Sequence, residues 1–194
     1  MPHYVSLMRW TSQSFAWNHG DIQDEIASTW IGMVGPGIAN NGVDTSTWTD
    51  HTDVRPTMLS LLGLKDDYVQ DGRLVREALS GWALPDAVQQ SGRYVQLTSI
   101  YKQLNAPFGS FAMDTLKAST RALGSGSATD DSAYSSLESR IATLTSQRDA
   151  LAAQIKAALN NATFNDQPIS NKQAGDYVSQ ARDLLDQAAA LAGA

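Results

Sequence analysis

Too few strand signals occur in this chain to account for a sheet. The clearest is the short apolar run Thr29–Val34, which stops at Gly35-Pro36-Gly37 and has the pattern of a buried strand in a parallel sheet. A weaker candidate lies in the aromatic-rich residues 4–17. Because one or two strands cannot form an independently stable sheet, residues 1–80 are expected to be the C-terminal portion of an α/β domain.

Short helical signals follow the strand candidates. Asp53 is a plausible N-cap, Pro56 falls in the first turn, and Gly63 ends an apolar helical face. A second short helix is expected after Asp71-Gly72. Residues 1–80 therefore contain one or two strands, loops and two short helices.

From residue 81 onward the pattern is almost entirely helical. A helical extension is expected over residues 81–123, with one apolar face between Tyr94 and Leu104 and a further helix from about Phe111. The Gly- and Ser-rich residues 124–133 are typical of a flexible linker. Fold class is thus an α/β remnant followed by a mostly α-helical region, with helix predominating.

Residues 134–194 are expected to form an antiparallel helical hairpin. Apolar residues recur at spacings of three, four and seven between about 134 and 160, with Arg148 in the seam, and a second alanine-rich helix spans about 171–191. At 1.5 Å per residue the first helix would be roughly 40 Å long. The alternative is a coiled coil, in which the hairpin self-associates with a second copy.

Charge and composition exclude several classes of protein. The net charge of −6 argues against a nucleic-acid binder, which needs clustered Lys and Arg. No apolar run approaches the ~20 residues of a membrane span, and the N-terminus lacks the pattern of a signal peptide. The absence of cysteine removes disulfides, thiolate metal sites and cysteine nucleophiles but leaves the compartment open.

His19 is the strongest candidate for a functional residue. An imidazole in a loop beside a sheet, followed by Gly20, can offer a nitrogen to Zn²⁺. A loop histidine with an ordinary polar partner fits the same pattern. Asp21, Asp24 and Glu25 either orient this histidine or belong to a solvated face.

Other polar residues have two interpretations each. His51 and Asp53 are either a metal or acid–base pair, or a packed histidine beside a helix cap. Arg55 either meets a phosphate or lies on the surface, and Gly35-Pro36-Gly37 either approaches a ligand or only ends the strand. His3, near the terminus, carries no information.

Three stretches together resemble the C-terminal end of the alkaline phosphatase superfamily, which includes type I phosphodiesterases and sulfatases. They are Asn18-His19-Gly20 with TWIGMVGPGI at 29–38, DHTDVRPTMLSLLGL at 50–64, and Asp71-Gly72-Arg73. In that group a late His-Gly loop precedes a strand ending in Gly-Pro-Gly, and a helix beginning near His-x-Asp-x-x-Pro-Thr follows. The likeness covers about residues 15–80, and the stretch 50–64 is its most specific part.

The resemblance implies that residues 1–80 end a doubly wound α/β domain with a two-metal site, usually zinc, that activates a Ser or Thr nucleophile on a phosphoester. Only His19 matches a metal ligand of the family. The other ligands and the nucleophile are expected upstream of His19, which only 18 residues precede. We therefore expect the C-terminal segment of a metal-dependent phosphoester hydrolase, inactive alone and without tight metal binding of its own.

The alternative is a non-catalytic helical interaction or oligomerisation module left after truncation. Neither the substrate nor the compartment follows from the sequence, although relatives in the superfamily are often exported. No nucleic acid partner and no membrane span are expected.

Overall fold

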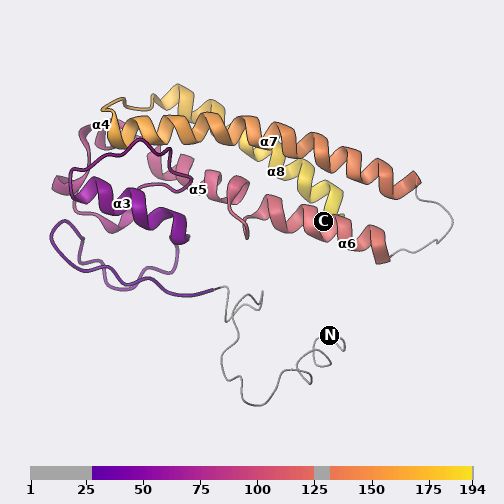
Figure 1. Ribbon diagram of the computed structural model, residues 1–194, viewed down its shortest axis with the longest axis horizontal. Helices are drawn as coiled ribbons and strands as arrows, with labels where there is room; N and C mark the ends of the chain where they lie inside the picture. Colours follow the sequence, from indigo (N-terminus) through magenta and orange to yellow (C-terminus); the bar gives the residue numbers. More distant parts are fainter. Residues whose placement is uncertain (1–27, 125–131, 194) are drawn as a thin grey trace, which may run out of the picture. The chain divides into compact units, whose positions relative to one another are not determined.

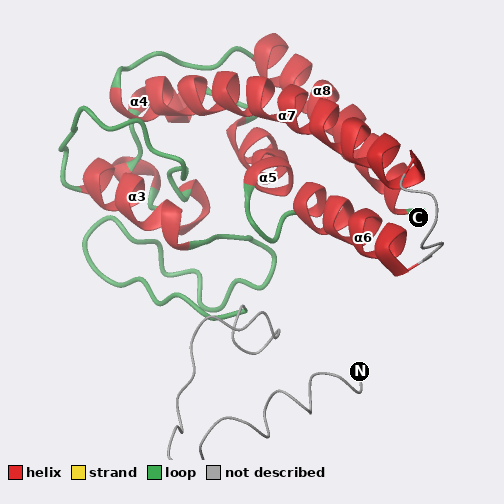
Figure 2. Cartoon of the chain, turned by 45° about the vertical axis from the view of Figure 1, so that its right-hand side comes forward, coloured by secondary structure: helices red, strands yellow, loops and turns green. Residues whose placement is uncertain are grey.

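The computed structural model describes residues 28–124 and 132–193, most of which are helical (Figures 1 and 2). The predominantly helical fold expected from the sequence is confirmed for this part of the chain. Contacts divide the chain into a first unit that ends at Val34 and a second unit, Gly35–Ala194. The elements of the second unit are η1 (His51–Asp53), α3 (Val54–Leu61), η2 (Arg76–Ala78), η3 (Gly81–Ala83), α4 (Asp86–Gln90), α5 (Tyr94–Asn105), α6 (Ser110–Gly124), α7 (Ser132–Phe164) and α8 (Asn171–Ala192).

Helix α8 lies at the centre of the helical packing. It begins after Ser170, whose hydroxyl accepts a hydrogen bond from the Gln173 N–H at 3.1 Å, and ends at Gly193 in the left-handed conformation. Its buried face packs against α5, α6 and α7. Four of the six residues on that face are alanines, which let the neighbouring helices approach closely; the face comprises Ala174, Val178, Ala181, Leu184, Ala188 and Ala192.

Helices α5 and α6 follow one another along α7 and α8 (Figure 1). The chain breaks between them at Pro107, which cannot continue the hydrogen-bond ladder of α5. A short turn, in which the Gly109 N–H donates to the Ala106 carbonyl at 2.9 Å, leads into α6. Helices α5 and α6 thus form one interrupted helix, which packs with α7 and α8 as a three-helix bundle.

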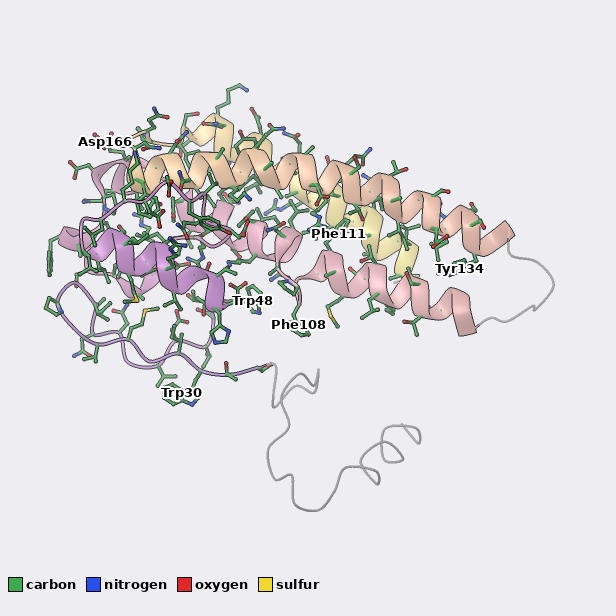
Figure 3. All side chains as sticks on the ribbon, in the orientation of Figure 1. Trp30, Trp48, Phe108, Phe111, Tyr134 and Asp166 are labelled. Carbon is green, nitrogen blue, oxygen red and sulfur yellow. The ribbon has the colours of Figure 1, made fainter. Side chains whose placement is uncertain are left out.

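Arg148, which the sequence places in the apolar seam of α7, is held at that seam by specific partners. Its guanidinium lies 5.3 Å from the centre of the ring of Phe111, which Figure 3 labels below α7. The guanidinium also donates to the Asn105 side-chain oxygen at 3.3 Å. It also pairs with Asp149 at 3.0 Å. Stacking on an aromatic face lets a charged group occupy a partly buried position.

The segments expected to be separate share one core. Leu74 and Leu79, from the first expected domain, cluster with residues of α4, α5, α6, α7 and α8. Residues 80 and 124 therefore do not divide the described part of Gly35–Ala194 into separate cores. Most of the expected linker, residues 125–131, lies outside the described residues.

The strand expected at Thr29–Val34 is wrong for the described structure, in which these residues have no regular secondary structure. A strand needs a neighbour that completes its hydrogen-bond ladder. Within the described residues the only such pairing is an isolated antiparallel bridge between Ile38 and Leu79. Trp30 and Val34 are 89% and 99% exposed. The strand expected within residues 4–17 lies outside the described residues.

The helix expected after Gly72 is also shorter than predicted. A single 3₁₀ turn, η2, is present, and the chain leaves it in an extended conformation at Leu79. The apolar residues that suggested a helix are instead used for burial, since Leu74 and Val75 are 0% and 3% exposed.

Among the described helices, none has the length and apolar character needed to cross a membrane.

Tyr94 gives the bundle a testable pH dependence. Its side chain is fully buried at the start of α5, and burial raises the pKa of Tyr94 from 10.0 to about 12. A pKa that is higher in the folded state stabilises the fold below pH 10 and loses that contribution as pH rises through 12.

We predict that the free energy of unfolding of Tyr94→Phe falls less between pH 9 and pH 12 than that of the parent chain. The difference should be about 2 kcal/mol at pH 12, from two pKa units. Urea denaturation at a series of pH values measures it. Parallel curves for the two proteins would contradict the assignment.

Candidate functional site

Several of the candidate residues lie outside the part of the chain that the structure describes. These are His19, the expected metal ligand, with Asp21, Asp24 and Glu25 beside it, and His3. His19 therefore remains a prediction from the sequence.

The remaining candidates do not form an acid–base pair or a phosphate site. His51 is exposed, and both carboxylate oxygens of the buried Asp53 are engaged by groups other than His51. Arg55 is exposed, forms an ion pair with Asp66, and lies 5.1 Å from the centre of the Tyr68 ring. Its role is that of a surface residue.

Residues 48–73, here called the motif segment, contain both the stretch 50–64 and Asp71-Gly72-Arg73. Asp50 is the N-cap of η1, because its carboxylate accepts the Thr52 N–H at 2.9 Å. Asp53 completes a capping box by accepting the Asp50 N–H at 3.3 Å. Asp53 therefore helps to cap η1, whereas the sequence suggested that it caps the following helix.

The motif segment folds back so that residues near Asp53 contact residues 72–73. Asp53 Oδ1 accepts the backbone N–H of Arg73 at 2.8 Å. Thr57 Oγ1 donates to the Asp53 carbonyl at 2.7 Å and accepts the Val75 N–H at 3.0 Å. Two of the stretches that carry the sequence resemblance, residues 50–64 and 71–73, are thus in direct contact, although 20 positions separate Asp53 from Arg73.

Gly72 allows this contact because the two turns pass very close together. A Cβ atom at position 72 would lie 2.0 Å from the Thr52 carbonyl oxygen and 2.6 Å from the Asp53 nitrogen. Both of these are backbone atoms, which cannot swing aside as a flexible side chain does. Only glycine fits there without separating the turns.

A lysine of the helical bundle completes the cluster. Lys102 of α5 is 2% exposed, and its ammonium lies 2.6 Å from Asp53 Oδ1 and 3.1 Å from Asp50 Oδ2. The ammonium also donates to Thr52 Oγ1 at 3.1 Å. Its three donors thus have three partners, all in the motif segment.

The two carboxylates respond differently to this environment. Burial raises the pKa of Asp53, and the opposing effects of Lys102 and the Arg73 N–H do not cancel it. Burial also acts to raise the pKa of Asp50, but hydrogen bonds from Thr52 and the charge of Lys102 outweigh it and leave that pKa lowered. Asp50 is therefore the carboxylate that Lys102 and Thr52 stabilise more effectively in its charged form.

Further polar contacts join the motif segment to the helices. The Tyr101 hydroxyl donates to the Asp71 carbonyl at 2.9 Å, and Lys156 of α7 pairs with the Asp71 carboxylate at 2.8 Å. Lys65 donates to the Asn165 side chain at 2.6 Å. Asp71 thus contacts both α5 and α7.

The polar atoms of Lys102 and Asp53 are paired within this cluster and are not turned toward a ligand. The donors of Lys102 are used internally, and the oxygens of Asp53 accept from Lys102, Arg73 and Asp50. In residues 28–124 and 132–193 there is no group of three or more His, Asp or Glu side chains placed to hold a metal ion. By its geometry, the cluster of Lys102, Asp50 and Asp53 joins the motif segment to α5.

A surface hollow of about 350 Å³ lies elsewhere, between the end of α3 and residues 82–85. Its lining includes Leu64, Trp82 and Phe164 with Lys65, but no His, Asp or Glu. Lys65 is the one charged side chain of this lining, and no carboxylate or imidazole accompanies it there.

Lys102 was missed by the sequence analysis, although a signal was present. It lies within the otherwise uncharged buried face of α5, next to Tyr101 and one turn after Thr98. A lysine in a buried stripe requires an anionic partner. The candidate partners include Asp50 and Asp53, about 50 residues away in the sequence.

No family model, no curated protein and no solved structure matches this chain in comparisons of sequence and fold.

The close passage at Gly72 gives a prediction for the motif segment. In Gly72→Ala, the added Cβ should force the two turns apart at a cost of about 1–3 kcal/mol. Thermolysin should then cleave within residues 50–73 about tenfold faster or more, since cleavage follows the population of the open form. Gly81→Ala is the matched control, because a Cβ there meets nothing within 4 Å. Equal rates for both variants would show that the turns tolerate the extra atom.

Proposed function

We propose that this chain is the C-terminal segment of a metal-dependent phosphoester hydrolase. It supplies one metal-binding residue, His19, and does not turn over substrate alone. The observation that supports the proposal best is the direct contact between two of the stretches that carry the sequence resemblance, residues 50–64 and 71–73. Asp53 accepts the Arg73 N–H, and Gly72 lies against Thr52.

The cluster of Lys102, Asp50 and Asp53 would have a structural role in such an enzyme. Because Lys102 and Asp53 are buried and spend their polar atoms on each other and on the backbone, they hold the turns in place and do not meet a substrate. This division of roles agrees with an enzyme whose nucleophile and remaining metal ligands lie on other residues. A zinc pair, when bound, would activate the nucleophile and stabilise charge on the phosphoryl group.

The α/β character of residues 1–80 belongs to the same proposal. Thr29–Val34 is apolar, yet Trp30 and Val34 are almost fully exposed. Large exposed apolar side chains of this kind mark surfaces that meet other protein. In the larger enzyme this run would be covered by other protein.

A second candidate function is a helical interaction module. Its support is that the core formed by α4, α5, α6, α7 and α8 is extensive on its own. Exposed large apolar side chains occur at the junction and outer face of α6, namely Phe108, Met113 and Leu116. Within residues 134–193 no large hydrophobic side chain is exposed, so self-association would use α6 more readily than the hairpin of α7 and α8.

The first candidate predicts that His19 is essential for zinc-dependent hydrolysis by the native protein. The protein would be captured from its source cells by an antibody against residues 134–193 and assayed with bis(p-nitrophenyl) phosphate. His19→Ala should lower the rate by more than about 100-fold, beyond the loss expected for an outer-shell partner. His51→Ala is the matched control, since His51 is exposed, and it should keep the parent rate and metal content.

The captured protein also separates the two candidates by mass. A species several tens of kilodaltons larger than the 20.9 kDa chain, with hydrolysis that depends on zinc and on His19, supports the hydrolase proposal. A species of 20.9 kDa without hydrolysis would contradict it and favour the helical module.

A further inference from the structure

The motif segment, residues 48–73, contributes little to the buried hydrophobic core. The core begins at Leu74, and no Ala, Val, Ile, Leu, Met or aromatic residue between positions 35 and 73 is buried. The buried residues of the motif segment are instead polar, small or proline: Asp53, Pro56, Thr57, Gln70, Gly72 and Arg73. Hydrophobic burial, which holds the helices together, therefore does little to hold this segment.

The large apolar side chains of the motif segment are mostly turned outward. Leu61 reaches the core in part, and Ile38, just before the segment, does the same. Val54 and Leu59 are half-buried. Six others are exposed to between 37% and 65% and lie in α3 or on either side of it: Trp48, Met58, Leu62, Leu64, Tyr68 and Val69. A segment with few buried apolar contacts belongs to the part of a fold that opens at low free energy.

What joins the segment to the helices is a small set of polar contacts of unequal strength. The Lys156–Asp71 pair is half-exposed, and such pairs contribute little because water screens them. The Lys102–Asp53 contact is shielded from water and Asp50 is partly exposed beside it, so that removing Lys102 leaves the buried Asp53 carboxylate without its cation. Lys102 is therefore the dominant attachment.

We propose that the motif segment is a separately opening unit that Lys102 latches onto α5. When the latch is intact, the capping box of Asp50 and Asp53 is fixed against the bundle. When the charge of Lys102 is lost, the segment detaches and α5, α6, α7 and α8 keep their packing, since their contacts with one another do not pass through it. This device is independent of the hydrolase proposal and holds for the chain in either candidate function.

Native-state hydrogen exchange of the whole chain tests the latch residue by residue. The reporter amides are those of Arg73 and Val75, which donate to the motif segment's own Asp53 and Thr57. The reference amides are those of Val178 and Ala181 in the buried face of α8. In the parent chain the reporters should exchange at least tenfold faster than the reference amides, because the segment opens without the bundle.

Lys102→Met should lower protection of the reporter amides by a further factor of ten or more and leave the α8 amides unchanged. Lys172→Met is the matched control, because Lys172 is 86% exposed and pairs only with Asp176 one turn along α8. It should change neither set of amides. Asp50→Asn, which weakens the latch without removing the buried lysine, should shift the reporters in the same direction by a smaller factor.

Two outcomes would overturn the proposal. If Lys102→Met and Asp50→Asn lower protection in α8 as much as in the motif segment, the two parts unfold as one cooperative unit. If neither variant changes the reporters, the attachment of the segment does not depend on Lys102.

Discussion

The attachment of the motif segment to the helical bundle depends on one ammonium group placed between two carboxylates. Lys102, on the buried face of α5, contacts both Asp53 and Asp50, and through them it fixes the turn that begins α3. Charges removed from water are stabilised only when their partners and hydrogen bonds are complete. Here they are complete, because each donor of Lys102 has an acceptor and Asp53 also accepts the Arg73 N–H. This joint links a helical bundle to a segment that has little hydrophobic attachment of its own.

The two sides of that joint are built by different forces. On the bundle side, the alanine-rich face of α8 packs against α5, α6 and α7, and stability comes from apolar burial. On the other side, hydrogen bonds and a close backbone passage at Gly72 set the shape, and the apolar side chains face outward. Such a surface suits a part of a protein that meets other structure.

Sequence patterns predicted the helical part well, because α5 and α6 follow from local features: an apolar stripe of helical period and a break at Pro107. The strand at Thr29–Val34 was wrong because a strand exists only with a neighbour, and an apolar run carries no information on whether that neighbour is present. The candidate site was predicted only in part. Asp53 was identified as a cap, but Lys102, its main partner, lies 49 positions further on, and no local pattern joins the two. His19 lies outside the described residues, so its role stays a prediction.

The most direct test of this account is a double-mutant cycle between Lys102 and Asp53. Lys102→Met, Asp53→Asn and the double variant would be compared through the free energy of opening at the Val75 amide. We expect a coupling energy above about 1 kcal/mol, within the range for residues in direct contact. Additivity within about 0.5 kcal/mol, the behaviour of independent sites, would show that the two groups do not stabilise each other and would contradict the central claim.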